Sequence, residues 1–167
     1  MSKYHLKYLG LMPIFVLLQI FVLNEILFFA YINPYLYLTL IISMPLKTQN
    51  WFFLIYAFVM GFLIDLFAGS LGFHSTATVF IAFIKIALSK ITIPYNILED
   101  IDEITLNKIG SKSFVVFSFL MILIHNSLLF VLEYLYLNLQ IIGKIILSSL
   151  VTLILILILE TFKNPKK

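Results

Sequence analysis

Asp65 is the residue whose type and position most clearly suggest chemistry, because it places a carboxylate inside a long apolar run. On membrane-insertion scales an ionised side chain in a spanning helix costs roughly 2.5–3.5 kcal/mol, so it normally faces protein or trapped water. Gly61 precedes Asp65 by about one helical turn, and His74 follows it beyond the sequence AGSLG at residues 68–72. We therefore expect neighbouring helices to pack around Asp65 and to supply it with a specific partner.

Glu25 is the candidate for a second acid, since two carboxylates that share a proton could form an intramembrane aspartyl protease or another hydrolase. Asp65, however, is the sole Asp in a predicted span and lacks the Gly-x-Gly-Asp context of such proteases. The three histidines, His5, His74 and His125, lie in different predicted elements without metal-ligand spacing. We expect no enzyme, no cofactor and no metal site. A hydrolase that acts on a lipid-linked substrate through Glu25 and Asp65 is the least favoured hypothesis.

The composition places most of the chain in a lipid bilayer. Of its 167 residues, 62% are hydrophobic and 11% are charged, whereas a soluble domain has ~25% charged residues. Apolar runs such as residues 145–159 lack the alternation of barrel strands, so we predict an all-α helical bundle that forms one domain over residues 1–167. The absence of cysteine excludes disulfides and thiolate chemistry, and the net charge of +3 does not indicate nucleic-acid binding.

Hydrophobic stretches predict about six membrane spans. They cover approximately residues 9–29, 35–46, 51–67, 73–89, 113–132 and 141–160. The second is shorter than the ~20 residues needed to cross, so we expect it to be tilted, to thin the bilayer locally, or to form a broken or re-entrant element. The polar stretch 91–112 is predicted to be a cytoplasmic loop with a short amphipathic helix at the membrane surface. Its acidic residues 99–103 are interpreted as solvated.

The lysines predict the orientation of the bundle. When the predicted spans are threaded through the bilayer, most lysines fall on the same side as both termini. These are the lysines at positions 3, 7, 47, 90, 108, 112, 163, 166 and 167. The connections 31–35, 69–72 and 134–140 contain none. By the positive-inside rule both termini are cytoplasmic, and Lys85 lies in the cytoplasmic half, where its long stem can reach the interface.

This threading gathers the polar side chains in the outer half of the bundle. We expect Asn24, Glu25, Asp65 and His74 to form a polar pocket or a partner-binding site. The sequence leaves Glu25, His74 and Lys144 open as partners of Asp65. His125 is interpreted as a hydrogen-bonded core residue.

Three glycines surround this region, and each has an expected structural role. Gly61 should let a neighbouring helix approach closely. Gly69 and Gly72 should serve the geometry of the turn between two spans.

With these residues in view, the chain resembles the bacterial rod shape-determining protein family MreD. The resemblance is carried by NPYL at residues 33–36, GFLIDLF at 61–67 and GSLGFH at 69–74, together with Gln19 and Asn24 in the first span. It extends from about residue 15 to residue 90, and the second half agrees in hydropathy. Where many members of the family have Asp after the proline, this chain has Tyr35.

The resemblance implies a non-catalytic subunit of the cell-elongation (rod) complex in the bacterial inner membrane, which contributes to cell shape and lateral peptidoglycan synthesis. It implies direct binding to MreC, a single-span protein with a large periplasmic part, in a complex with the cytoskeletal filament and peptidoglycan synthases. It also implies a bundle like that of the substrate-binding subunits of vitamin transporters. The alternative function is a small-molecule or lipid-binding transporter subunit that uses the polar outer half of the bundle.

Overall fold

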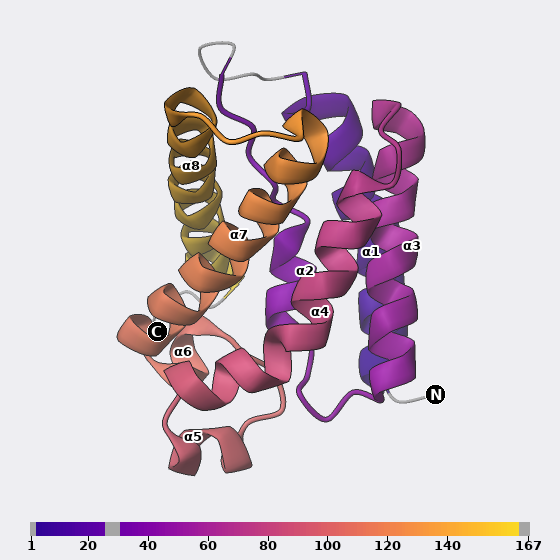
Figure 1. The fold of residues 1–167 in the computed structure, drawn as a ribbon. Coiled ribbons are helices and arrows are strands. Elements are labelled where there is room, and N and C mark those ends of the chain that lie inside the picture. Colours follow the sequence, from indigo (N-terminus) through magenta and orange to yellow (C-terminus); the bar gives the residue numbers. More distant parts are fainter. Residues whose placement is uncertain (1–2, 26–30, 164–167) are drawn as a thin grey trace.

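The computed structural model describes residues 3–25 and 31–163 and shows a bundle of long helices (Figure 1). Five helical segments are long and apolar enough to cross a membrane. They are α1 (Lys3–Leu18) with its π-helical continuation η1 (Gln19–Leu23), α3 (Asn50–Ala68), α4 (Phe73–Thr92), α7 (Ser111–Tyr134) and α8 (Leu139–Lys163). The predicted all-α, multi-pass membrane architecture is thereby confirmed within the described part of the chain.

The second predicted span is a broken element, and five helices rather than six have the length of a membrane span in the described residues. Only α2 (Leu38–Ser43) is helical there, and it lies among the long helices (Figure 1). Pro34 lacks a backbone donor and biases the residue before it toward extended backbone. Met44, which precedes Pro45, has the extended dihedrals φ −55° and ψ 139°. Pro34 thus disfavours helix at residue 33, and Pro45 ends α2, which has six residues.

The first predicted span differs at its start. Helix α1 begins at Lys3 rather than near residue 9, and Pro13 lies inside it. The predicted end of this span, at residue 29, lies outside the described residues.

Side chains of α8 replace the helical hydrogen bonds that the broken element lacks. Backbone N–H groups in a bilayer need a partner inside the protein. The N–H of Asn33 donates to Ser148 Oγ at 3.1 Å, and the N–H of Tyr35 donates to Thr152 Oγ1 at 3.0 Å. Ser148 and Thr152 are one turn apart on one face of α8, so that face acts as a polar track for the extended chain.

Gln19, at the start of η1, also forms hydrogen bonds with the backbone of this segment. Its Nε2 donates to Pro34 O at 2.9 Å, and its Oε1 accepts from the N–H of Leu36 at 3.1 Å. The same Nε2 donates to Asn24 Oδ1 at 2.9 Å. Gln19 is 1% exposed, and its amide serves as the hydrogen-bonding partner that a neighbouring strand would otherwise provide.

Two side chains satisfy the carbonyl groups at the C-terminal end of α2. Lys85 of α4 donates from Nζ to Ile41 O at 2.8 Å and also to Met44 O. Tyr8 donates its hydroxyl to Ser43 O at 2.8 Å. Lys85 is 1% exposed, so the expectation that its stem reaches the membrane surface was wrong. The C-terminal end of a helix has carbonyl groups without intrahelical donors and is the negative end of the helix dipole. Both features stabilise an ammonium group, which explains why Lys85 is buried.

The polar stretch 91–112 forms two short helices, α5 (Tyr95–Asp100) and α6 (Leu106–Ile109), where one amphipathic helix was predicted. Ile104 between them is fully buried. The carboxylate of Glu103 accepts from Lys7 Nζ at 2.7 Å, so this acid is bound to α1 rather than solvated. The stretch packs as a cap on the end of the bundle where α1 begins (Figure 1).

Candidate functional site

The candidate site is built on the hairpin of α3 and α4. The turn between these helices contains Gly69 and Gly72, whose φ angles are +66° and +85°. Residues with a Cβ are strained in this left-handed region. The two glycines reverse the chain within four residues and bring the start of α4 beside the last turn of α3, which carries Asp65.

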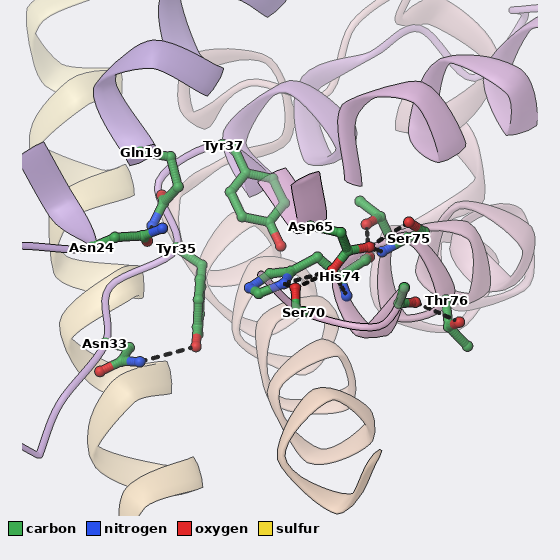
Figure 2. A network of polar contacts seen from close by, with 12 residues as sticks. Gln19, Asn24, Asn33, Tyr35, Tyr37, Asp65, Ser70, His74, Ser75 and Thr76 are labelled. Atoms are coloured by element: carbon green, nitrogen blue, oxygen red, sulfur yellow. Dashed lines mark hydrogen bonds and ion pairs between the residues drawn. The ribbon is translucent and has the colours of Figure 1, made fainter. Parts of the chain in front are cut away.

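Asp65 caps the N-terminus of α4 from the neighbouring helix (Figure 2). Its Oδ1 accepts from the backbone N–H of His74 at 3.0 Å and from Ser70 Oγ at 2.5 Å. Its Oδ2 accepts from the backbone N–H and the Oγ of Ser75, at 2.8 Å and 2.5 Å. His74 and Ser75 are the second and third residues of α4, whose N–H groups have no intrahelical acceptor. The carboxylate therefore does across the hairpin what an N-cap side chain normally does within one helix.

The imidazole of His74 completes this cluster. Its Nδ1 lies 3.1 Å from Asp65 Oδ1 and 3.2 Å from Ser70 Oγ. The far side of the ring extends toward Tyr35, and the centroids of the two rings are 5.8 Å apart (Figure 2). His74 is thus the residue, among the three that the sequence left open, that contacts Asp65.

The other two candidate partners of Asp65 have different surroundings. Glu25 is exposed and makes no hydrogen bond or ion pair with the residues that the structure describes. Lys144 donates to the hydroxyl of Tyr134 at 3.0 Å. No contact joins Glu25 to Asp65, so the pair of carboxylates that a hydrolase would need is not formed.

Gly61 sets the distance between the two helices directly below Asp65. A Cβ at this position would lie 2.6 Å from Ser75 Cα and 2.6 Å from Thr78 Oγ1. Real Cβ atoms do not approach backbone so closely, and small residues are the usual means of close helix packing in membranes. Gly61 and Asp65 therefore act on the same part of α4, one through contact and the other through hydrogen bonds.

A polar pocket of about 310 Å³ opens beside this cluster. Its polar lining comes from Asn24, Asn33, Tyr35, Ser70, His74 and Glu133. Of the predicted site residues, Asn24 and His74 line it, whereas Glu25 does not. Asp65 lies outside the lining but holds two lining side chains, Ser70 and His74, in place.

Sequence reasoning missed four residues of this polar pocket, of which Ser70 belongs to the turn that follows Asp65. Asn33 and Tyr35 belong to the broken element, whose path through the bundle was not predictable from hydropathy. Glu133 directly follows the predicted span 113–132, where an acidic residue needs no partner inside the bundle. The signal that could have singled them out is their common position at the outer end of three predicted elements.

A second polar chain crosses the core between the broken element, α7 and α8. The hydroxyl of Tyr37 lies 2.8 Å from His125 Nε2, and His125 Nδ1 lies 3.0 Å from Asn126 Oδ1. Asn126 Nδ2 donates to Ser149 Oγ at 2.9 Å. With the imidazole proton on Nδ1, Nε2 accepts a hydrogen bond from the Tyr37 hydroxyl, and each link has one donor and one acceptor. His125 is a fully buried, hydrogen-bonded core residue.

Within residues 3–25 and 31–163, no group of three His, Cys, Asp or Glu side chains is arranged to hold a metal ion. The arrangement instead offers a saturated carboxylate that joins two helices and a polar pocket beside it. Comparison with protein-family models, curated proteins and solved structures gives no match to this chain.

Proposed function

We propose that this chain is a non-catalytic, MreD-like subunit of an inner-membrane complex, and that it binds a single-span partner of the MreC type. The observation that carries the proposal is the saturation of Asp65 within its own hairpin. The segment with the most characteristic resemblance, residues 61–74, contains four of the five residues that clasp α3 to α4, and the fifth follows it directly. We refer to Gly61, Asp65, Ser70, His74 and Ser75 as the hairpin clasp.

The hairpin clasp suits a structural role better than a catalytic one. A general acid or base needs an oxygen atom that a substrate can reach. Asp65 is 3% exposed, and each of its oxygens already accepts at least two hydrogen bonds. A carboxylate in this state fixes the positions of two helices.

The fixed hairpin presents an apolar groove in which a partner helix would fit. The groove has a volume of about 470 Å³ and is lined by Leu54 and Phe58 of α3 and by Val79, Phe80 and Phe83 of α4. In a bilayer, helices associate by close van der Waals packing rather than by the hydrophobic effect, so the shape of a groove decides which helix it accepts. By setting the spacing of α3 and α4, the hairpin clasp sets that shape.

Two features support an orientation with both termini in the cytoplasm. The start of α1 and the end of α8 lie toward the same end of the bundle (Figure 1). Lysines at positions 7, 47, 90, 108 and 163 belong to the ends of elements that meet there, as the positive-inside rule requires of a cytoplasmic face. In this orientation the polar pocket opens on the outer side.

Co-purification tests the proposed partner. The tagged full-length chain should retain the MreC-type protein of the same cell, and Asp65→Leu should lose most of it, because the groove changes shape. Glu25→Gln is the matched control, since it changes an exposed carboxylate at the same end of the bundle. Normal co-purification and normal rod shape with Asp65→Leu would contradict the proposal.

The polar pocket favours a second candidate function, a subunit that binds a small molecule or lipid headgroup. A pocket of about 310 Å³ lined by six polar side chains is at the small end of the range for ligand sites. Native mass spectrometry of the purified chain checks this directly. A stoichiometric bound molecule supports the second function, and a bare chain under conditions that preserve bound lipid argues against it.

A further inference from the structure

We propose that the polar pocket binds a small organic cation with a primary ammonium group. This inference rests on the second candidate function and adds the chemical class of the ligand. It is carried by one unpaired carboxylate, one unpaired amide oxygen and one imidazole nitrogen, which belong to three residues that line the same pocket.

Glu133 gives the polar pocket its charge. Its carboxylate is exposed at the end of α7 and makes no hydrogen bond or ion pair with the described residues. Lys144, the cation of the following helix, is engaged elsewhere, because its Nζ donates to Tyr134 and lies 4.9 Å from the ring centre of Phe130. None of the described lining residues is a lysine or arginine. A cationic ligand would therefore find an uncompensated negative charge.

Asn33 contributes an acceptor without a donor. Its Oδ1 is buried and has no hydrogen-bond partner, whereas its Nδ2 donates to the hydroxyl of Tyr35 at 3.4 Å. Buried polar atoms in proteins almost always have a partner, so an orphaned acceptor beside a pocket points to a missing donor. Asn33 lines the pocket, so this amide oxygen belongs to a side chain that a ligand in the pocket would contact.

His74 contributes the third acceptor. Its Nδ1 faces Asp65 and Ser70, and its ring extends toward Tyr35 (Figure 2). With the proton of the neutral imidazole on Nδ1, directed at the carboxylate, Nε2 is left with a free lone pair. The hairpin clasp thereby fixes the position of a side chain that lines the pocket, and its carboxylate favours this tautomer.

Three acceptors match the three N–H donors of a primary ammonium group. A quaternary ammonium has no donor and is typically held by an aromatic cage, which these acceptors do not form. Phe73 and Leu129 provide apolar wall for a short carbon chain. The same chemistry occurs in free small amines and in the ethanolamine headgroup of a phospholipid.

Titration calorimetry with ethanolamine hydrochloride tests the proposal on the full-length chain in detergent micelles. Wild type should show saturable binding. Glu133→Gln should weaken the binding about tenfold, the factor that corresponds to ~1.4 kcal/mol. Glu25→Gln, which changes an exposed carboxylate that does not line the pocket, should leave the affinity unchanged. Circular dichroism melting of each variant verifies that it is folded.

Two probes of similar size sharpen this titration. Tetramethylammonium has the charge but no donors, and ethylene glycol has donors but no charge, so neither should bind measurably. Equal binding of tetramethylammonium, equal weakening by Glu133→Gln and Glu25→Gln, or no saturable binding of ethanolamine to folded wild type would overturn the inference.

Bilayer nanodiscs separate the two sources of the ammonium group. Selective retention of phosphatidylethanolamine over phosphatidylcholine, lost in Glu133→Gln, identifies the headgroup, whereas binding of free ethanolamine in phosphatidylcholine discs identifies a solute. Both results support the inference. If native mass spectrometry finds a different bound molecule and ethanolamine does not bind, the ammonium class is wrong while the second candidate function stands. A chain that binds neither contradicts both.

Discussion

Asp65 and Lys85 are both charged side chains buried within membrane-spanning helices, and each is stabilised by the end of a different helix. Asp65 accepts hydrogen bonds at the N-terminus of α4, where the helix dipole is positive. Lys85 donates to carbonyl groups at the C-terminus of α2, where the dipole is negative. Asp65 and Lys85 therefore do not act as counterions for each other.

The two sites differ in how far apart their partners lie in the sequence. Asp65 is joined to residues five, nine and ten positions away, so its surroundings follow from one tight turn. Lys85 is joined to residues 44 and 41 positions away, which requires the broken element to run through the bundle. A local carboxylate clasp forms with its hairpin, whereas the lysine site forms only when the whole bundle assembles.

The largest expected effect comes from removing the carboxylate. Asp65→Leu removes the acceptor of five donors, which are two backbone N–H groups, two hydroxyls and the Nδ1–H of His74. We expect a loss of about 3–5 kcal/mol in the free energy of unfolding, as for a broken buried charge network. Unfolding of the full-length chain in mixed micelles, followed by circular dichroism, measures it. If Asp65→Leu lowered the free energy of unfolding by less than Lys85→Met does, the lysine site rather than the carboxylate site would be the more important of the two for stability.

Removing the lysine should cost less. Lys85→Met keeps a flexible apolar stem but leaves two carbonyl groups unsatisfied, and it also removes the cost of burying an ammonium group. We expect a loss of about 1–3 kcal/mol in the same unfolding measurement. An unchanged or increased stability would show that the end of α2 is satisfied without this side chain.

Gly61 provides a test of the hairpin that involves no charge. Gly61→Ala places a Cβ 2.6 Å from Ser75 Cα, and we expect this overpacking to reduce stability by about 1–3 kcal/mol. Gly10→Ala is the matched control, because a Cβ there meets nothing within 4 Å. Equal melting temperatures for the two variants would argue against close packing of α3 on α4.

The polar track on α8 should show the smallest effect. Thr152→Val preserves the shape of the side chain but removes the acceptor for the N–H of Tyr35. Hydrogen bonds between membrane helices average about 0.6 kcal/mol, so we expect a loss of ~0.5–1 kcal/mol in the unfolding measurement. If Thr152→Val lost more stability than Lys85→Met, the contacts of the extended residues 33–35 with α8 would hold the broken element in place more strongly than the contacts of α2 with Lys85.

Hydropathy predicted the long helices because each is a nearly continuous apolar run, and it could not predict the path of residues 33–44. Pro34 and Pro45 indicate where that path breaks, but the partners Ser148 and Thr152 lie 115 and 117 residues from the groups they bind. Within the candidate site, His74 was predictable because one turn separates it from Asp65. Glu133 and Asn33 were not, because their proximity depends on how three elements pack.

Hydrogen exchange at the start of α4 tests the central claim most directly. The first N–H groups of a helix normally exchange quickly, because they lack intrahelical acceptors. If Asp65 caps α4, the N–H groups of His74 and Ser75 should be protected in wild type. They should lose that protection in Asp65→Leu, while amides near Ile81, at mid-helix, remain slow. Rapid exchange of His74 and Ser75 in folded wild type, or protection that survives Asp65→Leu, would contradict the account.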